Sequence, residues 1–320
     1  MLLVTGAAGF IGYHVARRLL ESGADVVGVD SLNPYYAPAL KRDRLQQLAQ
    51  FGGFRFAMAD IASPGMLEAA LPARDVTAII HLAAQAGVRH SIDAPFEYER
   101  ANGLGHLSVL EYARAAPKLK HLVYASSSSV YGDRAEGPFR EDDRCDAPAS
   151  LYAATKRSCE LMSETYARLY AIPQTGLRFF TVYGPWGRPD MAYYMFTEKL
   201  LAGEELTLFG DGKLARDFTY VDDVSAAVAR IVEAPPQGTP PHDIYNLGNS
   251  KPSTVLELVA AVERATGVRA KTVLAPPQPG DVTVTFADHS RASARFGFAP
   301  RTTLEDGVQR FVDWYTAWRR

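Results

Sequence analysis

A glycine-rich turn near the start of the chain constrains its fold more than any other feature. The turn, Gly6–Gly12 (GAAGFIG), follows an apolar run, Leu2–Thr5, and leads into an amphipathic segment. Glycines at this spacing permit a tight turn, a close approach of the backbone to a pyrophosphate and close packing of a helix on a strand. The first amides of the helix then attract phosphate. We therefore predict a Rossmann-type dinucleotide site that includes Gly6, Gly9, Phe10, Ile11 and Gly12.

The pattern that follows this turn is typical of a parallel sheet, because short apolar runs alternate with longer amphipathic segments. We expect strands at Leu2–Thr5, Asp25–Val29, Phe54–Ala57, Val76–His81, His121–Ala125 and Gln174–Phe180. We expect helices at Phe10–Ser22, Pro38–Ala49, Pro64–Leu71, Pro95–Ala115 and Leu151–Tyr170. The predicted fold class is α/β, with a Rossmann-type doubly wound parallel sheet and a smaller C-terminal α/β portion that binds substrate.

The chain becomes richer in turns after about Tyr183. Proline-rich and glycine-rich loops separate expected helices at Met191–Ala202, Asp222–Glu233, Thr254–Thr266 and Thr303–Trp318 from expected strands at Leu206–Phe209 and Ile244–Leu247. We predict a cofactor-binding domain at residues 1–180 and a second domain at residues 181–320, whose segments can interleave.

Composition excludes several classes of protein. Of the 320 residues, 47% are hydrophobic and 22% are charged, which is typical of globular domains and not of disordered or fibrous chains. The net charge is −2 without a basic cluster, so we expect no nucleic-acid partner. The most apolar stretch, Val76–Val88, is too short to span a membrane. Cys145 and Cys159 lack metal-ligand spacing, and the chain has no secretory signal, so we expect reduced thiols, a cytoplasmic protein and no metal site.

Acidic and small residues follow the expected strands. Asp30 lies about 20 residues after the glycine turn, where a carboxylate accepts hydrogen bonds from a ribose and repels a 2′-phosphate, so NAD is favoured over NADP. Asp60, followed by Ile61, either meets the adenine edge or caps a helix near Pro64. Leu82, Ala83, Ala84 and Gln85 follow the fourth strand and are small enough, for the most part, to let a cofactor lie against the backbone.

A chemical site is indicated by Tyr152 and Lys156, which are four residues apart and so share one helix face. A cation beside a phenol stabilises the phenolate, which suits a tyrosine that acts as a general base. Alone, such a pair is more typical of a solvated helix face. The hydroxyl run Ser126–Ser129, however, ends the fifth strand, at the sheet edge where open α/β folds bind ligands.

Together these motifs resemble those of the extended short-chain dehydrogenases/reductases, and within them the NAD-dependent nucleotide-sugar epimerases. The resemblance covers essentially the whole chain and is strongest with UDP-glucuronate 4-epimerases. The segments that carry it are Asp30–Tyr36 (DSLNPYY), Gln85–Arg89 (QAGVR), Ser126–Ser129, Arg178–Ala192 (RFFTVYGPWGRPDMA), Arg216–Asp223 (RDFTYVDD) and Tyr245–Gly248 (YNLG).

The resemblance implies residue roles. Tyr152 would be the catalytic base, and Lys156 would hold the nicotinamide ribose and tune Tyr152. Ser127 would be the assisting hydroxyl, with Ser128 and Ser129 as alternatives. The sugar would be oxidised at carbon 4, turn over as a 4-keto intermediate and be reduced on its other face, which converts UDP-glucuronate to UDP-galacturonate. The implied NAD contacts also include Asn33, Asn102, Ser126 and Phe179. A homodimer through Pro95–Ala115 and Leu151–Tyr170 is implied too.

The resemblance also implies contacts to the substrate. Arg188 and Thr181, with Ser128 or Ser129, would hold the uronate carboxylate, and Arg89 would line the pocket. Arg216 or Lys199 would contact the diphosphate, Asp281 the uridine ribose and Phe209 the uracil. From the residues alone, Arg216 is equally well a surface salt bridge, Asp281 a turn-forming residue after Gly280 and Phe209 a core aromatic. Gln278 stands where some related epimerases have arginine, and His90 where a tyrosine is expected. Related dehydratases and decarboxylases carry an acidic residue at the position of Ser129, so elimination is disfavoured here.

Three other functions stay open at this stage. The chain is alternatively a neutral UDP-hexose 4-epimerase or a UDP-glucuronate decarboxylase. A non-catalytic NAD sensor is a third possibility, although it has no need of Tyr152 and Lys156.

Overall fold

The chain divides into two units that interleave along the sequence. The computed structural model describes residues 1–134, 137–276 and 282–319. The first unit comprises residues 1–132, 144–179 and 225–245, and the second comprises residues 133–143, 180–224 and 246–320.

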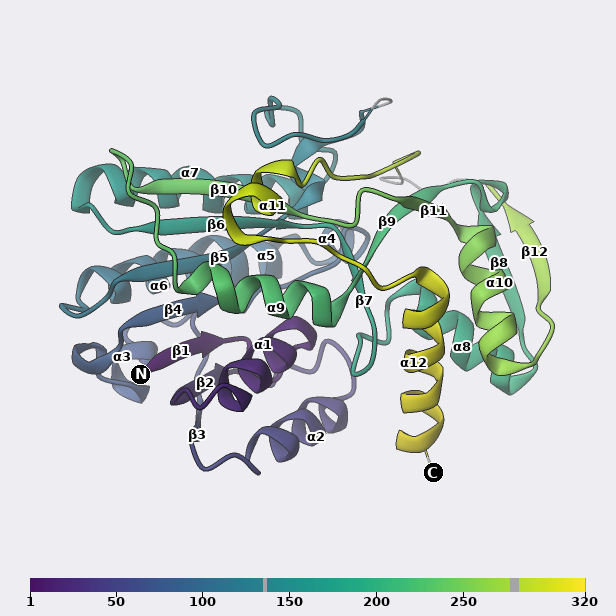
Figure 1. Ribbon diagram of the computed structural model, residues 1–320, viewed down its shortest axis with the longest axis horizontal. Helices are drawn as coiled ribbons and strands as arrows, with labels where there is room; N and C mark the ends of the chain where they lie inside the picture. Colours follow the sequence, from purple (N-terminus) through teal and green to yellow (C-terminus); the bar gives the residue numbers. More distant parts are fainter. Residues whose placement is uncertain (135–136, 277–281, 320) are drawn as a thin grey trace. The chain divides into compact units, whose positions relative to one another are not determined.

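A seven-stranded sheet forms the centre of the first unit. In spatial order its strands are β10 (His242–Leu247), β6 (Gln174–Phe179), β5 (His121–Ser127), β4 (Ala78–His81), β1 (Leu2–Thr5), β2 (Val26–Asp30) and β3 (Phe54–Met58) (Figure 1). The ladders from β3 to β6 are all parallel. The strand order changes direction between β1 and β4, and that point is where open α/β sheets bind their ligands. The doubly wound parallel fold predicted from the sequence is confirmed.

Helices cover the sheet on both sides. Those that lie wholly or partly in this unit are α1 (Phe10–Glu21), α2 (Pro38–Leu48), α3 (Met66–Ala70), α4 (His90–Asp93), α5 (Pro95–Tyr98), α6 (Gly105–Arg114), α7 (Leu151–Tyr170) and α9 (Val221–Val232). Helix α1 contacts α2. A second group consists of α3, α5, α6 and α7, in which α6 contacts α3 and α7, and α7 also contacts α5. Apolar side chains such as Leu3, Ile79 and Val109 are fully buried in the core between these elements.

The expected helix Pro95–Ala115 differs from a single regular helix. Helix α5 ends at Tyr98 and α6 begins at Gly105, and a π-helical turn, Glu99–Leu104, joins them. Such turns insert one extra residue and are common near functional sites. Gly103, within this turn, and Gly105, directly after it, lower the helix propensity of the segment. The Asn102 side chain forms hydrogen bonds to the backbone of Gln85, outside the helix.

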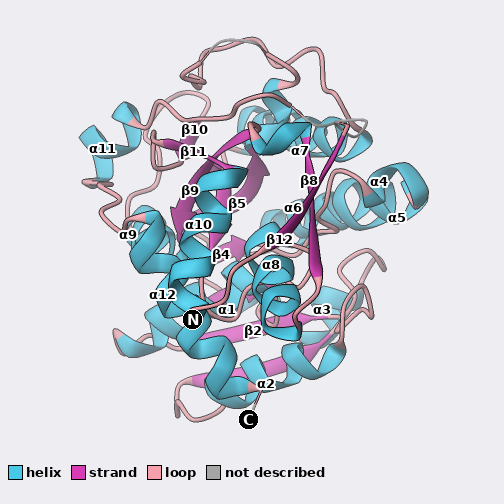
Figure 2. Cartoon of the chain, turned by 90° about the vertical axis from the view of Figure 1, so that its right-hand side faces the viewer, coloured by secondary structure: helices cyan, strands magenta, loops and turns pink. Residues whose placement is uncertain are grey.

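The second unit contains two small sheets. One has the order β11 (Pro252–Thr254), β9 (Ala215–Tyr220), β7 (Thr181–Tyr183), and the other pairs β12 (Lys271–Ala275) with β8 (Glu205–Phe209), visible side by side in Figure 2. Its helices are α8 (Ala192–Ala202), α10 (Val255–Thr266), α11 (Ser290–Phe296) and α12 (Leu304–Trp318). Strands β7, β9, β11 and β12 were not expected, because they carry no clear apolar alternation and β7 and β11 have only three residues each.

Aromatic side chains fill the core of the second unit. Tyr183 packs edge-to-face on Tyr193 and Phe218, and Phe311 packs edge-to-face on Tyr193. Offset and edge-to-face ring pairs add stability beyond the area that they bury. This core supports the strand β7 and the loop after it, which carry two of the predicted substrate contacts, Thr181 and Arg188.

Candidate active site

The glycine turn forms a cradle at the switch point of the sheet. Gly6 has a φ of +72°, and a Cβ atom there would lie 2.7 Å from the backbone nitrogen of Ala83, in the loop after β4. Gly9 is the N-cap residue of α1 and has no side chain that could accept from the helix amides. The first amides of α1 are those of Phe10, Ile11 and Gly12. Amides at a helix N-terminus suit a bound phosphate.

Asp30 braces this turn from the end of β2. One carboxylate oxygen accepts a hydrogen bond of 3.1 Å from the Ala8 amide, and the other accepts one of 2.8 Å from the Leu32 amide. The side chain of Arg44, which is fully buried, donates to the Ala8 carbonyl oxygen at 2.8 Å. Asp30 and Arg44 thus hold the glycine turn at Ala8, one through the Ala8 amide and the other through the Ala8 carbonyl oxygen.

The loop after β4 carries an unpaired buried donor. The Nε2 atom of Gln85 is buried and has no hydrogen-bond partner in the part of the chain that the structure describes. Its Oε1 atom accepts a bond of 3.1 Å from Asn33, whose own side-chain oxygen accepts from Lys41. An unsatisfied buried donor beside a glycine cradle fits a polar ligand. These residues therefore fit a dinucleotide cofactor.

Two predicted cofactor contacts bond within the protein. The Asn102 side chain accepts from the Gln85 amide at 2.8 Å and donates to the Gln85 carbonyl and to Thr155. The Asp60 carboxylate accepts from the Ala62 amide at 2.9 Å and pairs with Arg100. Helix α3 begins at Met66 with Gly65 as its N-cap residue, so the alternative that Asp60 caps this helix is wrong. The neighbouring Ile61 side chain is buried.

Tyr152 and Lys156 lie one turn apart near the start of α7. The Lys156 side chain is buried and donates a hydrogen bond of 3.0 Å to the carbonyl oxygen of Ala125 in β5. The Tyr152 ring is half-buried and packs edge-to-face against Tyr98, at 6.0 Å between centroids. Ser150 caps the helix by accepting a bond from the Ala153 amide. Helix and strand therefore hold the phenol and the ammonium on one side of α7.

The four serines after Ala125 have different partners. The Oγ of Ser126 is buried and donates to Glu160 at 2.6 Å. The Oγ of Ser127 accepts from the Ser129 amide at 3.2 Å and from the Ser129 hydroxyl at 2.9 Å. Ser128 begins the 3₁₀ turn Ser128–Tyr131 and is half-buried, while Phe179 lies opposite Ser127 in the β5–β6 ladder.

A buried ion pair lies under α7. Glu160 and Arg178 have side chains that are 0% and 2% exposed, and they form two hydrogen bonds, of 2.8 and 3.0 Å. Burial disfavours the carboxylate, but the hydrogen bonds and charge of Arg178 outweigh that effect and hold the pKa of Glu160 below its ordinary value. Glu160 is therefore ionised across the neutral pH range.

The sequence that forms this site matches a known protein family. Residues 2–248 match the NAD dependent epimerase/dehydratase family. The chain belongs to this family. The match includes the glycine turn, Asp30, the serine run and the Tyr152–Lys156 pair, and so covers every predicted cofactor contact.

Individual members of the family are similar to this protein along nearly its whole chain. A probable UDP-glucuronate 4-epimerase from Rhizobium meliloti is 44% identical, and the match covers 98% of this chain and 96% of the relative. UDP-glucuronate 4-epimerase 1 from Arabidopsis thaliana is 44% identical over 99% of this chain and 77% of its own. A solved UDP-glucuronic acid 4-epimerase from Bacillus cereus, in complex with UDP-glucuronic acid and NAD, superposes with a TM-score of 0.91 at 34% identity and covers 99% of both chains.

Predicted substrate contacts fall on both units. Arg89 immediately precedes α4 in the first unit. In the second unit, Thr181 opens β7 and is half-buried. Arg188 forms a bidentate ion pair with Asp190, with its Nε and Nη2 atoms 3.0 and 2.8 Å from the carboxylate oxygens. That edge of the Arg188 guanidinium therefore faces a protein carboxylate in this structure.

The remaining contacts predicted for the uridine diphosphate also lie in the second unit. Arg216 is in β9 and is half-buried, and its Nη1 atom donates to the Ala215 carbonyl oxygen at 2.9 Å. Phe209 ends β8, and Lys199 lies in the last turn of α8. Asp281 and Gln278 lie outside the described residues. These roles stay predictions.

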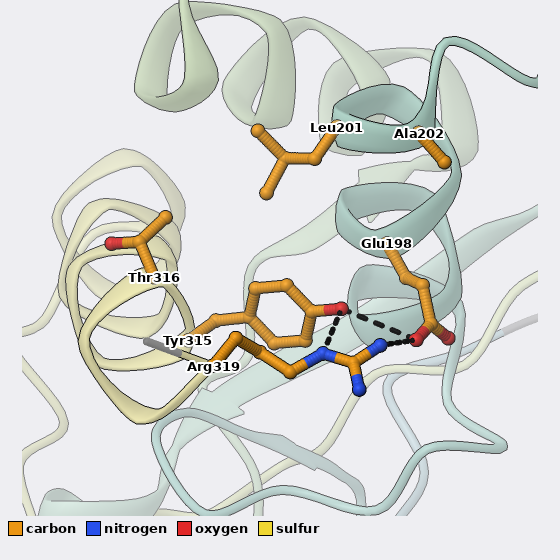
Figure 3. Close-up of a pocket in the computed structure, with 6 residues that line it drawn as sticks. All are labelled: Glu198, Leu201, Ala202, Tyr315, Thr316 and Arg319. Carbon is orange, nitrogen blue, oxygen red and sulfur yellow. Dashed lines mark hydrogen bonds and ion pairs between the residues drawn. The ribbon is translucent and has the colours of Figure 1, made fainter.

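A surface pocket of about 490 Å³ in the second unit involves none of the predicted residues. It lies between α8 and α12 (Figure 3), and its lining residues are Glu198, Leu201, Ala202, Tyr315, Thr316 and Arg319. Its polar groups bond to one another, since Tyr315 accepts from Arg319 at 3.2 Å and donates to Glu198 at 3.2 Å. We assign it no role.

Within residues 1–134, 137–276 and 282–319, no three histidine, cysteine or acidic side chains gather as metal ligands. No helix in these ranges has the length and apolarity needed to cross a membrane. Cys145 and Cys159 are both buried, and neither forms a disulfide.

Four residues near the site were missed by the sequence analysis: Arg44, Tyr98, Glu160 and Arg178. Glu160 follows Lys156 by four residues, so it lies on the same helix face as the predicted base. Arg178 is a lone charge in the otherwise uncharged strand β6, Gln174–Phe179. A charge in a strand that is buried on both faces needs a partner, and this was the available signal.

Proposed function

We propose that this protein is a UDP-glucuronate 4-epimerase, which interconverts UDP-glucuronate and UDP-galacturonate. The single observation that carries the proposal is the Tyr152–Lys156 helix face beside the Ser126–Ser129 segment, next to a glycine cradle that fits NAD. Relatives with this printed activity, similar along the full chain, support it.

We propose that the chain binds NAD through the turn Gly6–Gly12, Asp30 and the loop after β4. The turn offers uncapped helix amides to the pyrophosphate, and Asp30 offers a carboxylate to the adenosine ribose. When bound, NAD supplies a hydride acceptor for carbon 4 of the sugar and returns the hydride to the opposite face.

Tyr152 would take the proton of the sugar 4-hydroxyl and later return it. The Lys156 ammonium stabilises the phenolate through its charge, and its hydrogen bond to Ala125 fixes where that charge lies. Ser127 would assist, with Ser129 keeping the Ser127 hydroxyl oriented through their 2.9 Å bond. General acid–base catalysis of this kind contributes about 10²- to 10⁴-fold in rate.

A uronate substrate adds a chemical demand. The 4-keto form of glucuronate is a β-keto acid, which loses carbon dioxide when its carboxylate aligns with the carbonyl π system. Arg188, Thr181 and a hydroxyl of Ser128 or Ser129 would hold the carboxylate out of that alignment. Because Asp190 engages one edge of Arg188, the substrate would exchange with Asp190 for that edge or use the other.

We also propose that the protein acts as a homodimer. Apolar side chains stand exposed on α5, on α6 and on α7, which contacts the other two helices: Phe96 is 87% exposed, Leu107 37% and Leu161 50%. Large exposed apolar side chains on neighbouring elements are typical of a contact with another chain. A second copy would cover them.

The experiment that tests the proposed function separates the products after incubation of the protein with UDP-glucuronate. The proposal predicts UDP-galacturonate, at an equilibrium that is reached equally from either sugar. A UDP-pentose would make the protein a decarboxylase. If UDP-glucuronate is not converted while UDP-glucose is, the protein is a neutral-sugar epimerase, and NAD binding without any turnover would indicate a sensor.

A further inference from the structure

The carboxylate of Glu160 is saturated by its neighbours. Its Oε1 atom accepts from Arg178 Nε at 2.8 Å and from Ser126 Oγ at 2.6 Å. Its Oε2 atom accepts from Arg178 Nη2 at 3.0 Å and from Arg157 Nη1 at 2.8 Å. Two donors on each oxygen leave no acceptor site for Lys156, one helical turn away.

Two residues of α7, one helical turn apart, form hydrogen bonds to two consecutive residues of β5. Tyr152, Lys156 and Glu160 are each four residues apart and so lie on one helix face. Lys156 bonds to the Ala125 carbonyl, and Glu160 bonds to the Ser126 hydroxyl. The next residue in the strand is Ser127, the proposed assisting hydroxyl.

The same ion pair reaches the far end of the serine run. The Arg178 guanidinium carbon lies 4.7 Å from the centroid of the Tyr131 ring, and Tyr131 ends the 3₁₀ turn that begins at Ser128. A cation over an aromatic face is attracted to it. Ser127, Ser128 and Ser129 therefore lie between two anchors, Ser126 on Glu160 and Tyr131 on Arg178.

We propose that Glu160 and Arg178 are positioning residues, which fasten both ends of the segment Ser127–Ser129 so that its hydroxyls stay aligned with Tyr152. The pair also keeps the Glu160 carboxylate from drawing the Lys156 ammonium away from Ala125. This role rests on the proposed function, because the alignment matters only if Tyr152 and Ser127 act on a substrate.

The test uses the double variant Glu160→Gln/Arg178→Met in the full chain. Either single substitution removes one half of the buried bidentate pair and leaves the other charge behind, which destabilises the fold, whereas the double variant removes both charges of that pair. The matched control is Val109→Ala, a truncation of a fully buried side chain in α6 that has no predicted role in the site. Amide hydrogen exchange is measured by mass spectrometry, and kcat and KM are measured with UDP-glucuronate.

In the double variant we expect amides of residues 126–132 to exchange at least tenfold faster than in the wild type, while β1 is unchanged. We expect kcat to fall about 10- to 100-fold, with KM within threefold, because a misalignment near 1 Å costs up to about 10²-fold. Val109→Ala should show neither local change. Equal exchange in residues 126–132 for the wild type and the double variant, or an unchanged kcat, would overturn the inference.

The two claims fail separately. If the wild type converts no UDP-glucuronate, the proposed function is wrong. The exchange of residues 126–132 still decides whether the ion pair fastens the serine segment, since it needs no substrate and no turnover.

Discussion

Lys156 of α7 donates a hydrogen bond of 3.0 Å to the carbonyl oxygen of Ala125 in β5. Ala125 directly precedes the serine run, and Tyr152 lies one turn before Lys156. The bond therefore links the helix that carries the proposed base to the strand that carries the proposed assisting hydroxyl. Because the Lys156 side chain is buried, its charge is little screened by solvent and acts strongly on groups nearby.

Replacing Lys156 by methionine should lower kcat about 10²- to 10³-fold, because the charge beside Tyr152 and the link to Ala125 are both lost. Steady-state conversion of UDP-glucuronate measures the effect. Lys118→Met is the matched control, since Lys118 forms a surface pair with Asp75 that contributes little to stability. A Lys156→Met enzyme as fast as the control would rule out a role for the ammonium.

Replacing Asp30 by asparagine should weaken NAD binding about tenfold or more and reduce the preference for NAD over NADP. The amide offers one acceptor oxygen where the carboxylate offers two, so the Ala8 or the Leu32 amide loses its partner. Titration of the cofactor-free protein with each dinucleotide checks this. The exposed Asp146→Asn is the control, and an unchanged ratio of the two dissociation constants would contradict the role of Asp30.

Acid should destabilise the fold through buried histidines. Burial, with a smaller effect of the Lys156 charge, lowers the pKa of His106 to about 3, and burial also lowers the pKa values of His81 and His242. In the fold each of the three binds a proton less readily than an unfolded histidine, which does so below about pH 6.5. The contribution of His106 to stability is therefore complete above pH 6.5 and is lost as the pH falls toward 3, by up to about 1.4 kcal/mol per pH unit. The contributions of His81 and His242 are lost in the same direction.

Urea unfolding at pH 7.5, 6.0 and 5.0 measures this loss. The variant His106→Asn removes one titrating group, and it should make the decline with pH shallower than in the wild type. If the two slopes were the same, His106 would not be a source of the acid sensitivity.

Glutamate at Phe96 and Leu107 should dissociate the proposed dimer, because a charge at an apolar contact loses its hydration without gaining a partner. Sedimentation velocity should give a dimer for the wild type and a monomer for Phe96→Glu/Leu107→Glu. Leu274→Glu, at a comparably exposed apolar position in β12, should stay a dimer. A monomeric wild type would refute the proposal.

Much of the first unit was predictable, because strand and helix periods are local. The helix Leu151–Tyr170 was predicted with its observed bounds, and the glycine turn and Asp30 indicated the sheet edge where ligands bind. The π-helical turn at Asn102 was not predictable, since it depends on bonds to Gln85 and Thr155, which are distant in sequence. The partnership of Glu160 with Arg178 was missed for the same reason.

The second unit was less predictable. Strands β7 and β9 are stabilised by pairing with each other more than by their own sequence pattern. The bidentate contact between Arg188 and Asp190 could have been suspected from their spacing, but Arg188 was predicted as a substrate contact or a solvated loop charge, not as an ion pair.

The most direct test of the proposed reaction uses UDP-glucuronate that carries deuterium at carbon 4. If one bound NAD takes the hydride and returns it to the other face, UDP-galacturonate should form with the deuterium still at carbon 4, without added reductant. Mass spectrometry and proton NMR of the separated product measure this. Loss of the deuterium to solvent, or a UDP-pentose as the product, would contradict the proposed 4-epimerisation.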